Sequence, residues 1–146
     1  MLMVLPQVTL VLAAALAVVN LWLSIRVGQV RQSEKISVGD GGNDRVIRRM
    51  RAHANFGENA WLILVLVFAI EVSGGEPGWL WAATVAFVVG RIAHGFGMDG
   101  WRPGRPIGTG ITMVLQVALA IWAVAIALSA ERAASVPAVE MVSLQG

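Results

Sequence analysis

The stretch RVIRRMRAHANFGE, residues 45–58, runs directly into an apolar span that ends near Val72. Successive residues of a helix are about 100° apart, so one polar set falls within about 80° of a single face. Its members are Arg48, Arg51, Asn55 and Glu58. The stripe is about 15 Å long at 1.5 Å per residue. Ionisable groups at membrane depth normally face a cavity or a partner. The stripe is therefore either a topology-setting basic cluster, with Glu58 neutralised by an arginine, or part of a polar site.

The composition places the chain among membrane proteins. Of its 146 residues, 57% are hydrophobic and only 14% are charged. Apolar runs of about 20 residues, long enough to cross a bilayer, recur along the chain. The net charge is only +2, and basic residues sit at the ends of apolar runs, where anionic headgroups attract them. A nucleic-acid partner is not expected.

Two residue types are missing, and this limits the chemistry of the chain. There is no cysteine, so no disulfide, thiolate metal site or protein thiol nucleophile is expected, and we predict no metal. There is no tyrosine either, which removes the phenol as an acid or hydrogen-bond donor. Any sulfur chemistry has to come from a substrate.

The apolar runs and turn signals predict an all-α membrane protein, a bundle of four transmembrane helices. The first span carries one strongly polar side chain, Asn20, as an interhelical bond or a ligand contact, and Asp44 is expected to cap the second helix. We expect one domain over residues 1–130 and a mobile tail over 131–146. The four spans are expected at about residues 4–24, 45–72, 79–98 and 108–128.

The basic residues predict the orientation of the bundle. Ten of the eleven Lys and Arg residues flank the first and third loops, and only Arg132 belongs to the other end. Cytoplasmic loops carry an excess of such residues. The first and third loops are therefore expected on the cytoplasmic side, and both termini on the opposite side.

A second polar constellation closes the third span. Arg91, His94 and Met98 are spaced i, i+3, i+7 and share a helix face. A lone histidine such as His94 is more often a hydrogen-bonded structural residue than a catalyst. His53, off the polar stripe, is expected to be structural or interfacial. Two helices that each present Arg with a polar partner make a basic pocket at the membrane surface. Such a pocket suits a small anionic ligand, because guanidinium groups bind carboxylates in bidentate fashion.

These residues carry a resemblance. RMRAHANFGEN (49–59) resembles the signature of the membrane-associated proteins in eicosanoid and glutathione metabolism, the MAPEG family, and GRIAHGFG (90–97) is similar to its second motif. VGQVR (27–31) and VGDGG (38–42) resemble the small bacterial branch. The resemblance covers about residues 10–128 and implies a homotrimer in a bacterial inner membrane, with the active site toward the cytoplasm.

The resemblance also implies a ligand and the residues that hold it. Glutathione, as co-substrate, is expected between neighbouring subunits. Arg105 is the best match for the family's thiolate-stabilising arginine, and Arg102 is a close rival because the loop is short. The chain departs from the pattern of some members at Ala54, Met98 and Pro106, which stand where arginine, tyrosine and serine occur. The matching ligand positions are Arg31, Arg51, Asn55, Glu58, Arg91 and His94.

The leading interpretation is a microsomal-type glutathione S-transferase or peroxidase that acts on lipophilic electrophiles dissolved in the bilayer. The alternative is a non-catalytic lipid-binding or scaffold protein, a class that the family also contains. A small four-helix drug exporter is disfavoured, because that mechanism needs a membrane-embedded carboxylate, typically in the first helix, and the first span has none. The expected partners are a second and third copy of the chain, membrane lipid and a lipophilic small molecule.

Overall fold

A computed structural model describes residues 5–74 and 77–135 of the chain. These residues form four α-helices, each long and apolar enough to cross a membrane, which confirms the predicted fold class. The four helices are α1 (Gln7–Ser33), α2 (Asp44–Val72), α3 (Pro77–Met98) and α4 (Gly104–Ser135).

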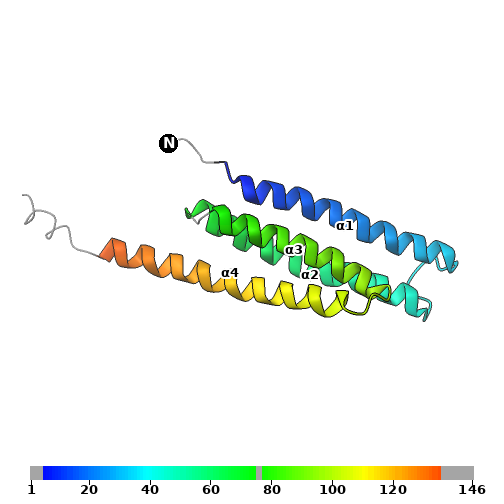
Figure 1. Ribbon diagram of the computed structural model, residues 1–146. Coiled ribbons are helices and arrows are strands. Elements are labelled where there is room, and N and C mark those ends of the chain that lie inside the picture. The colour runs from blue at the N-terminus through cyan, green and yellow to red at the C-terminus, as the bar shows by residue number, and fades with distance from the viewer. Residues whose placement is uncertain (1–4, 75–76, 136–146) are drawn as a thin grey trace, which may run out of the picture.

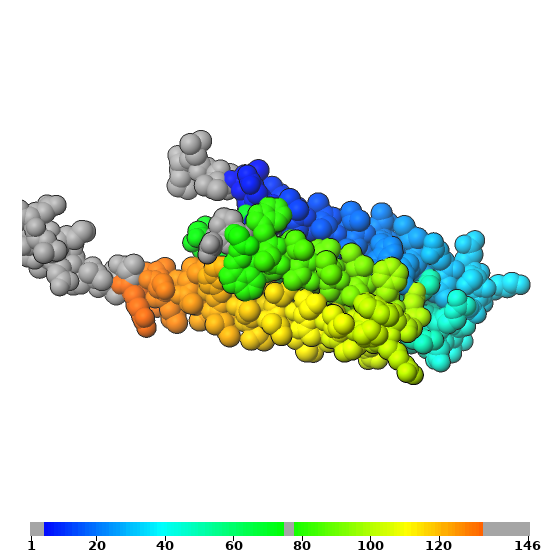
Figure 2. All heavy atoms as spheres, in the orientation of Figure 1, coloured from blue at the N-terminus to red at the C-terminus, as the bar shows by residue number. Residues whose placement is uncertain are grey.

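The four helices run side by side with α2 and α3 in the middle of the bundle (Figure 1). Both central helices pack on each other, on α1 and on α4, whereas α1 and α4 do not touch. In the space-filling view α3 fills the space between α1 and α4 (Figure 2). The α1–α2 and α3–α4 connections lie together at one end, which we call the loop end (Figure 1).

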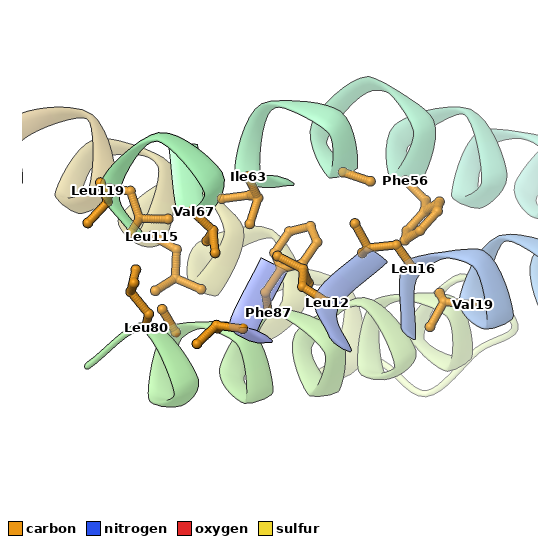
Figure 3. Close-up of a cluster of buried hydrophobic side chains, with 14 of the residues drawn as sticks. Leu12, Leu16, Val19, Phe56, Ile63, Val67, Leu80, Phe87, Leu115 and Leu119 are labelled. Carbon is orange, nitrogen blue, oxygen red and sulfur yellow. The ribbon is translucent and has the colours of Figure 1, made fainter. Parts of the chain in front are cut away.

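A single apolar core runs along the bundle between the four helices. Leu12 and Leu16 of α1, Ile63 of α2, Phe87 of α3 and Leu119 of α4 are all buried there (Figure 3). The outward faces of the helices are also apolar. On α4, for example, large hydrophobic side chains are exposed from Ile107 to Leu128. An apolar exterior of this extent fits a lipid environment, because soluble monomers rarely expose contiguous apolar patches larger than a few hundred Å².

Boundaries of α1, α2 and α4 differ from the sequence prediction. Asn43, not Asp44, caps α2: its side-chain oxygen accepts hydrogen bonds from the backbone N–H groups of Arg45 (2.9 Å) and Val46 (3.3 Å). Helix α1 extends to Ser33. Helix α4 begins at Gly104, earlier than expected. Pro106 falls in its first turn, where the N–H group that proline lacks would have no partner within the helix. It also continues to Ser135, past the predicted domain end at 130, and residues 136–146 of the predicted tail lie outside the described residues.

At the end of the bundle opposite the loop end, a carboxylate of α2 caps α1. Glu71 accepts hydrogen bonds from the backbone N–H groups of Val8 and Thr9, both at 2.8 Å, and from the Thr9 hydroxyl at 2.7 Å. Pro6, at the N-cap of α1, offers no side-chain cap of its own. Glu71 therefore satisfies N–H groups that have no partner within their own helix, and it ties α1 to α2.

At the loop end, Asp99 joins three parts of the chain. Its carboxylate, just after α3, pairs with Arg26 of α1, and it accepts two hydrogen bonds from Arg49 of α2 at 3.1 and 3.0 Å. The Arg26 guanidinium also lies 4.4 Å from the centre of the Trp22 ring and 5.2 Å from that of Phe96. Partial burial raises the pKa of Asp99, but the hydrogen bonds from Arg49 and Arg26 and their charges outweigh it, so the pKa lies below its usual value.

We predict that Asp99→Asn lowers stability at pH 7 by roughly 1.5–3 kcal/mol, the range for hydrogen bonds to charged groups. A carboxyl with a lowered folded pKa stabilises the fold fully above its unfolded pKa of about 3.9, and this contribution is lost as pH falls through the folded value. Thermal unfolding of the purified protein between pH 7 and pH 3 should therefore show a smaller acid-induced loss in Asp99→Asn. Asp40→Asn, in the exposed first loop, is the matched control. Equal acid sensitivity of Asp99→Asn and wild type would contradict this assignment.

Candidate functional site

A hollow of about 250 Å³ opens between α2, α3 and α4 toward the loop end. We call it the polar hollow. It brings together five residues that the sequence singled out: Arg51, Asn55 and Glu58 of α2, His94 of α3 and Arg105 of α4. Ala54, Met98 and Thr109 complete its lining. Three of the four residues of the polar stripe thus face one cavity, as the cost of charged groups at membrane depth requires.

Close packing of α3 on α4 forms one wall of the polar hollow. A Cβ atom at Gly97 would collide with the backbone nitrogen of Arg105, and one at Gly108 would collide with the carbonyl oxygen of Gly90. Glycine lets helix backbones approach closely, and helix–helix contacts in membranes are rich in small residues. This contact places Arg105 and Thr109 across from His94.

Arg91 lies behind the polar hollow and does not line it. Its side chain is buried (1% exposed) and donates to Asn55 Oδ1 at 2.9 Å and to Thr112 Oγ1 at 3.3 Å. Because the Asn55 oxygen is occupied by this cation, the amide nitrogen is the group that Asn55 can offer elsewhere. Arg91 therefore acts as a positioning residue for Asn55.

The charged groups of the polar hollow are unpaired. Within residues 5–74 and 77–135, the side chains of Arg51, Glu58 and Arg105 make no hydrogen bond and no ion pair. The idea that an arginine of the chain neutralises Glu58 is therefore wrong for this part of the chain. Nδ1 of His94 is also buried, with no hydrogen-bond partner among the described residues. Two cations, one carboxylate and a buried ring nitrogen thus remain for a ligand or a partner.

A model of the MAPEG family matches residues 9–125. The chain belongs to the MAPEG family. The match runs from the first turn of α1 far into α4 and includes every residue that lines the polar hollow. A comparison with individually curated proteins gives no match.

Besides Arg91, two more of the predicted ligand residues of this MAPEG chain do not line the polar hollow. Arg31 lines a second hollow, of about 420 Å³, between α1 and α2, and its Nη2 atom lies 3.4 Å from the sulfur of Met50. Arg102 is exposed on the loop between α3 and α4 and does not line the polar hollow. Arg48, the first member of the stripe, lines a hollow with Arg45, Arg49, Met98 and Asp99 instead.

One hydrogen bond shows the role of both His53 and Asn20. His53 Nε2 lies 2.9 Å from Asn20 Oδ1, so both residues form an interhelical hydrogen bond between α2 and α1. This is the structural role expected for His53 and one of the two expected for Asn20. Among the described residues, no group of three or more His, Asp or Glu side chains is placed to hold a metal ion.

A polar ladder continues from Asn55 deeper into the bundle, and sequence reasoning missed it. Asn59 donates to the backbone oxygen of Asn55 at 2.7 Å, and Gln116 of α4 donates to Asn59 Oδ1 at 2.9 Å. Gln116 follows Thr112 by one helical turn. The spacing of Thr112 and Gln116 along an otherwise apolar span was the available signal, because buried polar groups in a membrane need partners.

We predict that Gly97→Ala destabilises the protein by roughly 1–3 kcal/mol, the usual cost of overpacking, because the added methyl group forces the first turn of α4 away from α3. Gly57→Ala is the matched control, since a Cβ atom at Gly57 meets nothing within 4 Å and alanine favours a helix. Thermal unfolding of both variants measures the difference. A Gly97→Ala protein as stable as Gly57→Ala would show that the α3–α4 contact is not tight.

Proposed function

We propose that the polar hollow binds glutathione and that the protein is a glutathione-dependent transferase or peroxidase. The observation that carries the proposal is the set of unpaired charges at Arg51, Arg105 and Glu58. Glutathione has two carboxylates, one ammonium group and a thiol, so it can satisfy two cations and one carboxylate at once. Membership of a family that includes glutathione transferases supports the same ligand.

The residues of α2 would hold the peptide part of the ligand. Arg51 would pair with a carboxylate in bidentate fashion, and Glu58 would accept a hydrogen bond from the ammonium group. Asn55 would donate its amide to a ligand oxygen, in the orientation fixed by Arg91.

Arg105 would stabilise the glutathione thiolate. A free thiol has a pKa of about 8.5, so only a few per cent is ionised at pH 7. Lowering that pKa by two requires about 2.7 kcal/mol of preference for the thiolate. A permanently charged guanidinium near the low-dielectric mouth of the bundle suits this role. Arg105 is favoured over Arg102, because Arg105 lines the polar hollow and Arg102 does not.

The site would be shared between subunits of a homotrimer. The polar hollow, at about 250 Å³, is smaller than the roughly 300–1,000 Å³ of typical ligand pockets. The second hollow, lined by Arg31, His53 and Ala54, offers another basic surface on the α1 side of α2. Facing that surface toward the polar hollow of a neighbour would bring Arg31 to the ligand. The loop end would lie on the cytoplasmic side of a bacterial inner membrane, where the basic residues gather.

The acceptor substrates would be lipophilic electrophiles that reach the site from the bilayer. The alternative function is non-catalytic binding of lipid or of a partner. Met98 favours that alternative, because it lines the polar hollow with a thioether, which donates no hydrogen bond to a thiolate. Conjugation of a generic aryl halide with glutathione distinguishes the two functions.

We predict that reduced glutathione raises the unfolding temperature of the purified protein, since ligands of the native state stabilise it by mass action. Arg51→Ala should weaken glutathione binding by about 2–5 kcal/mol, because it leaves a ligand charge unpaired. Asn55→Ala should cost about 1 kcal/mol, as for a neutral hydrogen bond. Isothermal titration measures both, with Arg48→Ala, on the same stripe but outside the hollow, as the control. Wild-type affinity in a folded Arg51→Ala protein would refute binding at this site.

A second prediction tests the sharing of the site. Arg31→Ala and Glu58→Ala subunits should each bind glutathione poorly when expressed alone. Co-expression should restore some intact sites, because a mixed trimer can combine an unaltered α1 surface with an unaltered polar hollow. Binding by tagged mixed trimers, purified through both tags, measures the restoration. Mixtures that never exceed either variant alone would argue against a shared site.

A third prediction concerns the thiolate. Arg105→Ala should keep much of the glutathione affinity but raise the pKa of the bound thiol toward its free value, because the nearest fixed cation is removed. Absorbance of the thiolate near 240 nm, titrated with pH, measures this pKa, and Arg102→Ala serves as the control. An unchanged midpoint in Arg105→Ala, with glutathione bound, would remove the proposed role of Arg105. If the pKa of the bound thiol rises in Arg102→Ala but not in Arg105→Ala, Arg102 is the stabilising residue.

A further inference from the structure

Two threonine hydroxyls of α4 lie close to the polar hollow, and they differ in their hydrogen bonds. The hydroxyl of Thr112 is buried and fully used: it donates to the carbonyl oxygen of Gly108 at 2.8 Å and accepts from Arg91 at 3.3 Å. A hydroxyl has one hydrogen to donate. Thr112 therefore has no donor left for a ligand.

Thr109 has its donor available. It is half-buried and lines the polar hollow. Among the described residues, its hydroxyl makes no hydrogen bond. This is notable because serine and threonine in helices often donate to the carbonyl four residues earlier. Thr112 and Ser129 of the same helix do so. The Thr109 hydroxyl thus opens onto the cavity with an unused hydrogen.

The position of Thr109 relative to Arg105 adds a second observation. The two residues are four apart on α4, so they lie on one face, one helical turn from each other. Both line the same hollow. Met98, across the hollow on α3, has no hydrogen to donate, and the side chain of Pro106 has none either. Thr109 is therefore the hydroxyl donor nearest in register to the proposed thiolate-stabilising arginine.

We propose that Thr109 is a further catalytic residue, whose hydroxyl donates a hydrogen bond to the glutathione sulfur beside Arg105. This rests on the proposed function. In the step concerned, the S–H bond of glutathione breaks and its proton goes to water. The sulfur keeps the electron pair and accepts the Thr109 hydrogen bond. The threonine forms no covalent bond and keeps its proton. Arg105 supplies the charge that favours the thiolate, and Thr109 fixes the direction of the sulfur.

The test compares Thr109→Val, which keeps the shape but removes the hydroxyl, with Thr109→Ser, which keeps the hydroxyl. Thr84→Val is the matched control, because the Thr84 hydroxyl is buried without a partner on α3 and does not line the hollow. The full-length protein is purified in detergent with reduced glutathione as the probe. The thiolate absorbance near 240 nm gives the pKa of the bound thiol, and an aryl halide gives kcat and KM.

A hydrogen bond to the charged thiolate should lower the thiol pKa by about 1–2. Thr109→Val should therefore raise the pKa by that amount and lower kcat below neutral pH about 10–100-fold, with less than a twofold change in glutathione affinity at a pH where the bound thiol is protonated. Thr109→Ser and Thr84→Val should match the wild type. If Thr109→Val fails to fold, Thr109→Ala carries the same expectation.

Three outcomes would overturn the proposal. A wild-type thiol pKa in Thr109→Val, with glutathione bound, removes the role of Thr109 and leaves the proposed function intact. A Thr109→Ser protein that behaves like Thr109→Val would show that the hydroxyl does not account for the effect, because serine keeps the hydroxyl. A wild-type protein that does not bind glutathione refutes the proposed function, and the role of Thr109 with it.

Discussion

The close contact between α3 and α4 is the constraint on which the candidate site depends. Lipid tails offer no hydrophobic driving force for helices to associate, so packing at small residues and hydrogen bonds has to hold them together. Gly90 and Gly97 of α3 meet Gly108 and the first turn of α4 at backbone distance. With larger residues there, α4 would stand further away. Arg105 and Thr109 would then leave the cavity that His94 and the α2 stripe line.

The buried cation of Arg91 is the second constraint. A charge in the bundle interior needs partners, yet among the described residues Arg91 bonds only the neutral side chains of Asn55 and Thr112. A buried charge without a counter-ion is costly. Its field also favours a negative group in the adjacent polar hollow. The same residue that orients Asn55 thus makes the cavity more attractive to an anion.

Sequence reasoning could identify the polar stripe and the second motif, because helical periodicity alone puts Arg51, Asn55 and Glu58 on one face. It also found His94 and Arg105, which the fold brings to the same hollow. It could not separate Arg91 from the residues that line the cavity, because periodicity shows a shared face but not its depth. The tertiary roles of Glu71 and Asp99 were missed for a related reason. Each bonds atoms more than 45 positions away, and no local pattern encodes such a pairing.

Charged groups that pair within the chain and charged groups that do not lie in different parts of this bundle. Glu71 at one end, and Asp99 with Arg26 and Arg49 at the other, have partners within the chain, and they tie helices together. Within the part of the chain that the structure describes, the exposed charged side chains of the polar hollow have no such partner. The buried Nδ1 atom of His94 beside them also lacks a partner there, and unsatisfied buried groups that reduce stability are typical of functional sites. One carboxylate and two arginines line the same hollow, beside a wall that glycine packing holds in place, and a zwitterionic anion would complete this arrangement.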